Sequence, residues 1–81
     1  MLLSKRIVYI MNNDVFKIIE VVGTSPDSME DAIQAAINRA ARSEHQLKWF
    51  EVVHTRGTIE NGAPAKYQVT VKIGVKLQDN D

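Results

Sequence analysis

The amino-acid sequence predicts an α+β fold with the element order β-α-β-β, in which a three-stranded antiparallel sheet is packed on one helix. The first and the third strand are indicated most directly, because the first is rich in β-branched residues and the third alternates apolar and polar residues. A stretch between them repeats apolar residues at helical spacing, and an Asn-Gly pair near the end indicates a hairpin. With 81 residues and no cysteine, the chain forms one domain at most, without disulfides to reinforce its core.

The first strand is expected over residues 15–22, which are rich in valine and isoleucine and are followed by Gly23 as a stop signal. The helix after it has two candidate starts. Ser25 before Pro26 suits an N-cap with proline at the first helical position, whereas Ser28 has an aspartate three residues later and offers a second capping pair. The apolar face of the helix, built largely of alanine, consists of Met29, Ala32, Ile33, Ala36, Ile37, Ala40 and Ala41.

The second strand is expected from about Trp49 to Glu60, and a turn follows at Asn61-Gly62, lengthened by residues 63–65. The third strand has the clearest alternation in the chain, with apolar residues on one face and polar residues on the other. The apolar face comprises Tyr67, Val69, Val71, Ile73, Val75 and Leu77, and the polar face comprises Lys66, Gln68, Thr70, Lys72 and Lys76.

One helix can cover only one face of this sheet, and the opposite face is expected to carry Trp49 and Val53 among polar groups. A core of this size rarely supplies more than roughly 3–5 kcal/mol on its own. Self-association would cover the apolar side chains and add to that stability, so the sequence predicts a homo-oligomer.

The chain divides into an N-terminal extension over residues 1–12, a domain over residues 13–78 and a tail over residues 79–81. The apolar run from Ile7 to Ile10 is too short to span a bilayer, and no signal-peptide cleavage site follows it. We therefore expect a cytoplasmic protein without membrane partners. The extension is either a short packed segment or a translated upstream stretch with Met11 as the natural start.

The composition argues against several classes of function. Ten basic residues balance ten acidic ones without a dense basic stripe, which argues against nucleic-acid or anionic-membrane partners. His45 and His54 have no nearby carboxylate at a spacing typical of a metal site. No Ser/His/Asp set, phosphate loop or carboxylate pair supplies a nucleophile or a base, so we do not expect an enzyme.

Trp49 and Gln68 are the candidate ligand-binding residues. An indole and a primary amide on paired strands offer a flat heteroaromatic ligand one surface to stack on and one group that hydrogen-bonds its edge. The alternative for Trp49 is packing in the core or at a subunit interface, because buried aromatic residues chiefly contribute apolar area.

A series of short motifs runs from Val15 to Leu77: Lys17-Ile18-Ile19-Glu20-Val21-Val22-Gly23-Thr24-Ser25-Pro26, Ala32-Ile33, Ala36-Ile37, Trp49-Phe50-Glu51-Val52, Arg56-Gly57-Thr58-Ile59, Asn61-Gly62, Tyr67-Gln68-Val69-Thr70-Val71-Lys72 and Gly74. Together they resemble the dodecin family, whose members are small flavin-binding proteins that assemble as hollow dodecamers. The resemblance implies a homo-dodecamer that stores riboflavin, FMN or FAD and protects it from light, rather than catalysing with it.

The resemblance also implies roles for three residues. Trp49 would stack on the isoalloxazine ring, Gln68 would hydrogen-bond its pyrimidine edge, and Arg56 matches a family arginine that approaches a ligand phosphate. The chemistry of the ring agrees, because its pyrimidine edge presents an N–H between two carbonyls and a primary amide both accepts and donates.

Arg56 is less simply placed than the other two. On a regular strand its parity is opposite to that of Trp49, so it would point to the other face. Either a bulge near Gly57 redirects it, or it serves a site formed with a neighbouring subunit. A third interpretation is a surface charge that pairs with Glu51 or Glu60.

One residue and one short segment depart from the family pattern. Val75 stands where many members carry phenylalanine, and residues 43–45 (Ser-Glu-His) replace a threonine-containing link. A second function also stays open, in which the protein is a structural self-assembling module whose Trp49 is an interface residue and whose pocket is empty or holds another ligand such as coenzyme A.

Overall fold

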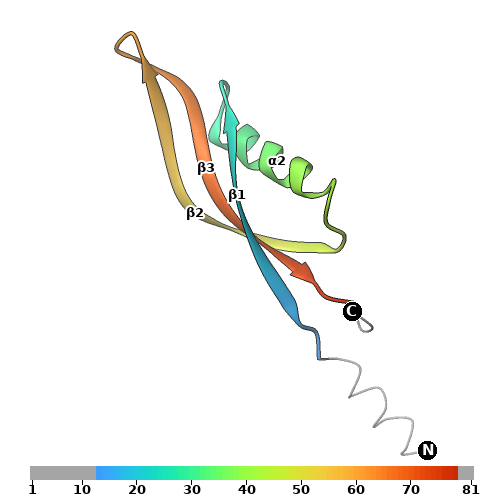
Figure 1. Ribbon diagram of the computed structural model, residues 1–81. Helices are drawn as coiled ribbons and strands as arrows, with labels where there is room; N and C mark the ends of the chain where they lie inside the picture. Colours follow the sequence, from blue (N-terminus) through green and yellow to red (C-terminus); the bar gives the residue numbers. More distant parts are fainter. Residues whose placement is uncertain (1–12, 79–81) are drawn as a thin grey trace, which may run out of the picture.

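The computed structural model describes residues 13–78, which form the four predicted elements in the predicted order. These are β1 (Phe16–Ser25), α2 (Met29–Ala40), β2 (Leu47–Glu60) and β3 (Ala63–Lys76), shown in Figure 1. The strands form one antiparallel sheet with β3 in the centre, in the order β1-β3-β2. The predicted extension and tail lie outside the described residues.

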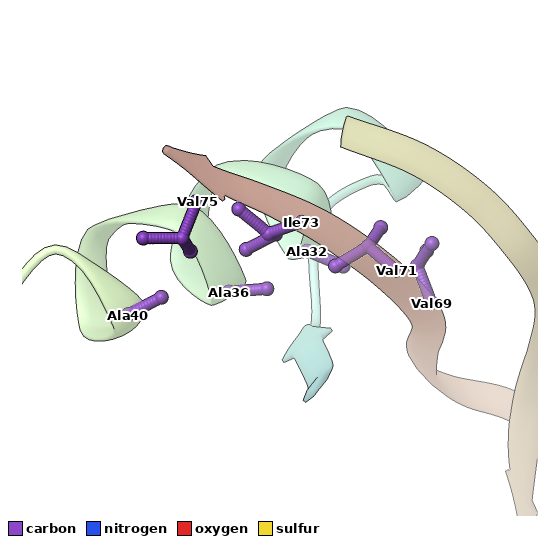
Figure 2. Packing of buried hydrophobic residues seen from close by; sticks show 7 residues of the cluster. All are labelled: Ala32, Ala36, Ala40, Val69, Val71, Ile73 and Val75. Atoms are coloured by element: carbon purple, nitrogen blue, oxygen red, sulfur yellow. The ribbon is translucent and has the colours of Figure 1, made fainter. Parts of the chain in front are cut away.

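The core lies between α2 and the apolar face of β3, as the two periodicities predict. Figure 2 shows three alanines of the helix facing four side chains of the central strand. Their small size lets the helix lie close to the sheet, and larger helix residues pack around them at the margin. The buried residues are Ala32, Ala36, Ala40, Val69, Val71, Ile73 and Val75; the predicted stripe member Ala41 is exposed and forms the C-cap.

The helix packs mainly on β1 and β3, so β2 is left largely without a helix above it. The β2–β3 hairpin projects past the helix (Figure 1). As a result, Phe50 and Val52 of β2 are exposed although they belong to the same side of the sheet as the core.

The predicted strand stop at Gly23 is wrong, because β1 continues to Ser25. A Cβ at Gly23 would overlap the backbone carbonyl oxygen of Ala32 and lie 3.0 Å from the Cβ of Ala36. The glycine therefore allows close approach of the helix to β1 and does not end the strand.

Of the two candidate caps, Ser28 is confirmed and Ser25 is wrong. The Ser28 hydroxyl accepts a hydrogen bond from the backbone N–H of Asp31 at 3.0 Å. Ser25 remains in the strand, where its buried hydroxyl donates to the Asp31 carboxylate at 2.8 Å and accepts from the N–H of Asp27 at 2.9 Å. Ser25 thus fixes the loop before the helix, while Ser28 ends the loop.

The β2–β3 turn is shorter than predicted. Asn61 and Gly62 alone form it, with φ of 52° and 77°, and Glu60 pairs with Ala63 across it. Positive φ at both central residues is the geometry of the two-residue hairpin turn that Asn-Gly favours. The expected lengthening through residues 63–65 is wrong, since these residues already belong to β3.

Candidate functional site

Within residues 13–78, one face of the sheet has no helix over it, and the candidate residues lie on that face. Odd-numbered residues of β3 such as Val69 and Ile73 point into the core, so the even-numbered ones point the other way. We call this second side, which carries Gln68, Thr70 and Gly74 of β3, the helix-free face.

Trp49 lies flat on Gly74. The two residues are paired across β2 and β3, and a Cβ at Gly74 would overlap the indole, nearest to Cε2 and equally near to Cζ2 and Nε1. That position is on the face of the ring, so one face of the indole covers the glycine backbone. With 40% of Trp49 exposed, the other face is open to a ligand or a partner.

Apolar side chains from β1 flank the tryptophan on the helix-free face. The rings of Phe16 and Trp49 are 6.3 Å apart between centroids and tilted by 56°. Ile18 is paired with Gly74 from the other side of β3 and is 56% exposed. The apolar neighbours of Trp49 on this face thus come from β1. Val53 has no partner on β3 in the register, so its predicted place on this face stays a prediction.

Two β-bulges in β2 determine which side chains reach this face. Leu47 pairs with Val75 on the core side but Trp49 pairs with the next residue, Gly74, so Lys48 is an extra residue that turns the indole away from the core. A second extra residue, Val53, lies between Trp49 and Arg56.

The bulge at Val53 gives Arg56 the same facing as Trp49. A bulge near Gly57 is one of the alternatives that the sequence leaves open for Arg56, and a register shift does occur between Gly57 and Ile59. That shift lies on the turn side of Arg56, so it cannot change the facing of Arg56 relative to Trp49. The extra residue at Val53 does so instead.

Arg56, Gln68 and Thr70 form a hydrogen-bonded cluster on the helix-free face. Arg56 is in register with Gln68, and its Nη1 lies 3.4 Å from Gln68 Oε1. Its Nη2 donates to Thr70 Oγ1 at 2.9 Å, and Thr70 is only 6% exposed. The predicted surface pairing of Arg56 with Glu51 or Glu60 is therefore replaced by bonds to neutral side chains.

The structure brings Arg56 to Gln68 but keeps both away from Trp49 within one chain. Gly74, under the tryptophan, and Gln68 are six positions apart on β3. At about 3.3 Å per residue this is about 20 Å along the strand. One chain therefore cannot offer both its indole face and its own Gln68 amide to a single ring system.

Other features of the described residues lie apart from this face. A hollow of about 560 Å³ lies between β1 and α2 and is lined by residues such as Gly23 and Arg39. Residues 13–78 contain no group of three His, Cys, Asp or Glu side chains placed to hold a metal ion. In the same range, no helix is long and apolar enough to cross a membrane.

Sequence reasoning missed three contributors to the site: Gly74 as the floor under the indole, Phe16 as its neighbour and Thr70 as the anchor of Arg56. Gly74 left a signal, because it interrupts an otherwise continuous strand pattern, and such a glycine marks close approach of another group. The sequence carries no comparable signal for Phe16 and Thr70, since their contacts with Trp49 and Arg56 depend on the strand order and the register of the sheet.

The family model described as Dodecin matches residues 15–78. The dodecin of Thermus thermophilus is 45% identical over 65 residues, which cover 80% of this chain and 94% of the relative. The calcium dodecin of Mycobacterium tuberculosis is 27% identical over 64 residues, with 79% and 90% coverage.

A solved structure of the dodecin from Streptomyces davaonensis superposes on this fold with a TM-score of 0.81 at 43% sequence identity, covering 84% of this chain and all of that one. The sheet topology and the single helix are those of the dodecin fold. On sequence and on structure, this chain belongs to the dodecin family.

Proposed function

We propose that this protein binds flavin without turnover and stores it inside a closed homo-oligomer, a dodecamer as the family name suggests. The observation that carries the proposal is the indole of Trp49, which lies on Gly74 with its second face open. Gly74 has no side chain, and this leaves room for the indole to lie on the strand with one face exposed. Such an arrangement is more typical of a stacking surface for a ligand than of a packed core.

Assembly would complete this site as well as stabilise the chain. Because about 20 Å of strand separates the tryptophan from Gln68 in one copy, a ring stacked on Trp49 would meet the Gln68 and Arg56 of a neighbouring copy. The apolar residues exposed around Trp49, among them Phe16 and Ile18, are the kind of surface that a second copy would cover.

The proposed mechanism is stacking followed by quenching. Indole is electron-rich and isoalloxazine is electron-poor, and an aromatic pair contributes about 0.5–1.5 kcal/mol beyond the area that it buries. After photoexcitation the flavin takes one electron from Trp49, and the electron returns to the indole without net chemistry. The stored flavin is thereby kept from photoreactions, in the cytoplasm.

The proposed ligand class is riboflavin, FMN or FAD, all of which present the same ring. One relative is named a calcium dodecin, whereas the name of the other, a dodecin, states no ligand. The alternative outcomes of the test are therefore an empty pocket and a pocket that holds another ligand, such as coenzyme A or calcium.

The test is a titration of the ligand-free protein with riboflavin and with FMN, followed by flavin fluorescence. We expect saturable binding with strong quenching, and a yellow colour in protein purified with its ligand. Assembled protein that neither quenches nor retains either flavin would contradict the proposal and favour the structural module.

A further inference from the structure

We propose that Arg56 is a positioning residue for flavin recognition, whose guanidinium fixes the Gln68 amide and so determines how the pyrimidine edge of the ring is bound. The inference rests on the proposed flavin-binding function, because it concerns the same site. It assigns Arg56 a role that does not depend on a ligand phosphate.

The guanidinium is held from β3 by two residues on one face. Gln68 and Thr70 are two positions apart, so both side chains point to the helix-free face. Nη2 donates to the buried Thr70 hydroxyl at 2.9 Å, and this bond anchors the group. Nη1 then reaches Gln68 Oε1 at 3.4 Å, directly across the paired strands.

Donor chemistry gives this contact a direction. A guanidinium has five N–H donors and no acceptor, so it can face only the oxygen of the Gln68 amide. The NH₂ group must then point away from Arg56. Without Arg56, the two ends of the amide could exchange by rotation about its last bond, and each of the two orientations would pair with a different carbonyl of a bound ring.

The fixed amide matches an imide edge, that is, an N–H between two carbonyls. The Gln68 NH₂ donates to one ring carbonyl, and the second lone pair of Oε1 accepts from the ring N–H. The positive charge of Arg56 strengthens the polarity of the amide along this direction. The orientation of the amide thus selects which of the two ring carbonyls it contacts, and with it the direction in which the ring lies.

The experiment compares riboflavin, which has no phosphate, with FMN in the assembled, ligand-free protein. We expect Arg56→Ala and Gln68→Ala each to weaken riboflavin binding roughly tenfold. The double variant should bind as Gln68→Ala does, because Arg56 acts through Gln68 and the two effects are not additive. Arg42→Ala, a matched change at an exposed arginine after the helix, should leave both affinities unchanged.

A conservative variant separates positioning from charge. Arg56→Lys keeps the charge for a phosphate but loses the planar two-nitrogen geometry, so riboflavin binding should fall as in Arg56→Ala. This variant also serves if Arg56→Ala does not assemble, which size-exclusion chromatography will show.

Three results would overturn the inference. Unchanged riboflavin affinity together with weaker FMN binding in Arg56→Ala would assign Arg56 to the phosphate. Additive losses in the double variant would mean that Arg56 acts independently of Gln68. If the parent protein binds neither flavin, the proposed function fails and this role fails with it, an outcome that the parent titration alone identifies.

Discussion

At Gly74 the absence of a side chain decides where the tryptophan lies. The indole occupies the space that any Cβ would take, so the platform depends on two residues and not on Trp49 alone. Trp49 reaches that space only because Lys48 is an extra residue that turns the strand.

Gly74→Ala should therefore move the indole off the sheet and weaken flavin binding roughly as much as removal of the ring. The new methyl group overlaps the face of the indole, which must rotate away. Riboflavin titration measures the effect. Ser43→Ala is a suitable control, because it is a similarly small change after the helix and its hydroxyl has only a 3.5 Å contact with the Ala40 carbonyl oxygen. Equal riboflavin affinity in Gly74→Ala and the parent would show that the ring does not need this floor.

Trp49→Ala should weaken flavin binding by more than about tenfold, since it removes both contact area and about 0.5–1.5 kcal/mol of stacking. Any flavin that still binds should recover its fluorescence. The control is Arg42→Ala, a change at an exposed residue after the helix, which should leave binding and quenching unchanged. If Trp49→Ala binds and quenches as the parent does, Trp49 is an interface residue and the sequestration mechanism is wrong.

At the scale of the elements, two serines have separate tasks at the start of α2. Ser28 caps the helix and Ser25 ties the end of β1 to the first helical turn. Both interactions involve Asp31, through its N–H and its carboxylate respectively, so the loop and the helix start form one hydrogen-bonded unit.

Ser28→Ala should lower the free energy of unfolding by about 1 kcal/mol, the usual contribution of an N-cap side chain. Chemical denaturation followed by circular dichroism measures it, at one fixed protein concentration because assembly affects the apparent stability. Ser43→Ala is the control, since its hydroxyl has only a 3.5 Å contact with the Ala40 carbonyl oxygen. A Ser28→Ala midpoint equal to that of the control would remove Ser28 as a stabilising cap.

The order and type of the elements could be predicted because hydrophobic periodicity reports them directly. Facing and register in β2 could not, because an extra residue such as Lys48 or Val53 carries no sequence signature and reverses the facing of every later side chain. The type of each candidate site residue was readable, but the separation of Trp49 from Gln68 was not. This separation depends on the register between β2 and β3, that is, on which residue of β3 pairs with each residue of β2. The predicted lengthening of the turn through residues 63–65 gives the wrong register.

At the scale of the molecule, the decisive property of the part that the structure describes is that α2 covers only part of the three-stranded sheet. Exposed apolar residues lie on both sides, with Ile18 and Trp49 on the helix-free face and Phe50 on the other. Surfaces of this kind mark interaction sites, and a chain this small gains stability by pairing them.

We expect light scattering to give a mass about twelve times the 9.1 kDa of the chain. Ile18→Glu should reduce this mass, because it places a carboxylate in the apolar patch, whereas Glu20→Gln on the same face of β1 should not. A parent protein that remains a stable monomer at micromolar concentration would contradict the assembly and the composite site together.

The position of Trp49 also provides a label that is already part of the chain. It is the sole tryptophan, so the near-ultraviolet emission of the indole reports from this single location. Its ring is partly exposed in one copy and lies beside the patch that a second copy would cover. Covering the ring with protein should shift that emission to shorter wavelength, and a stacked ligand should extinguish it. Subunit association and ligand occupancy can therefore be followed as two distinct spectral changes in the unmodified protein.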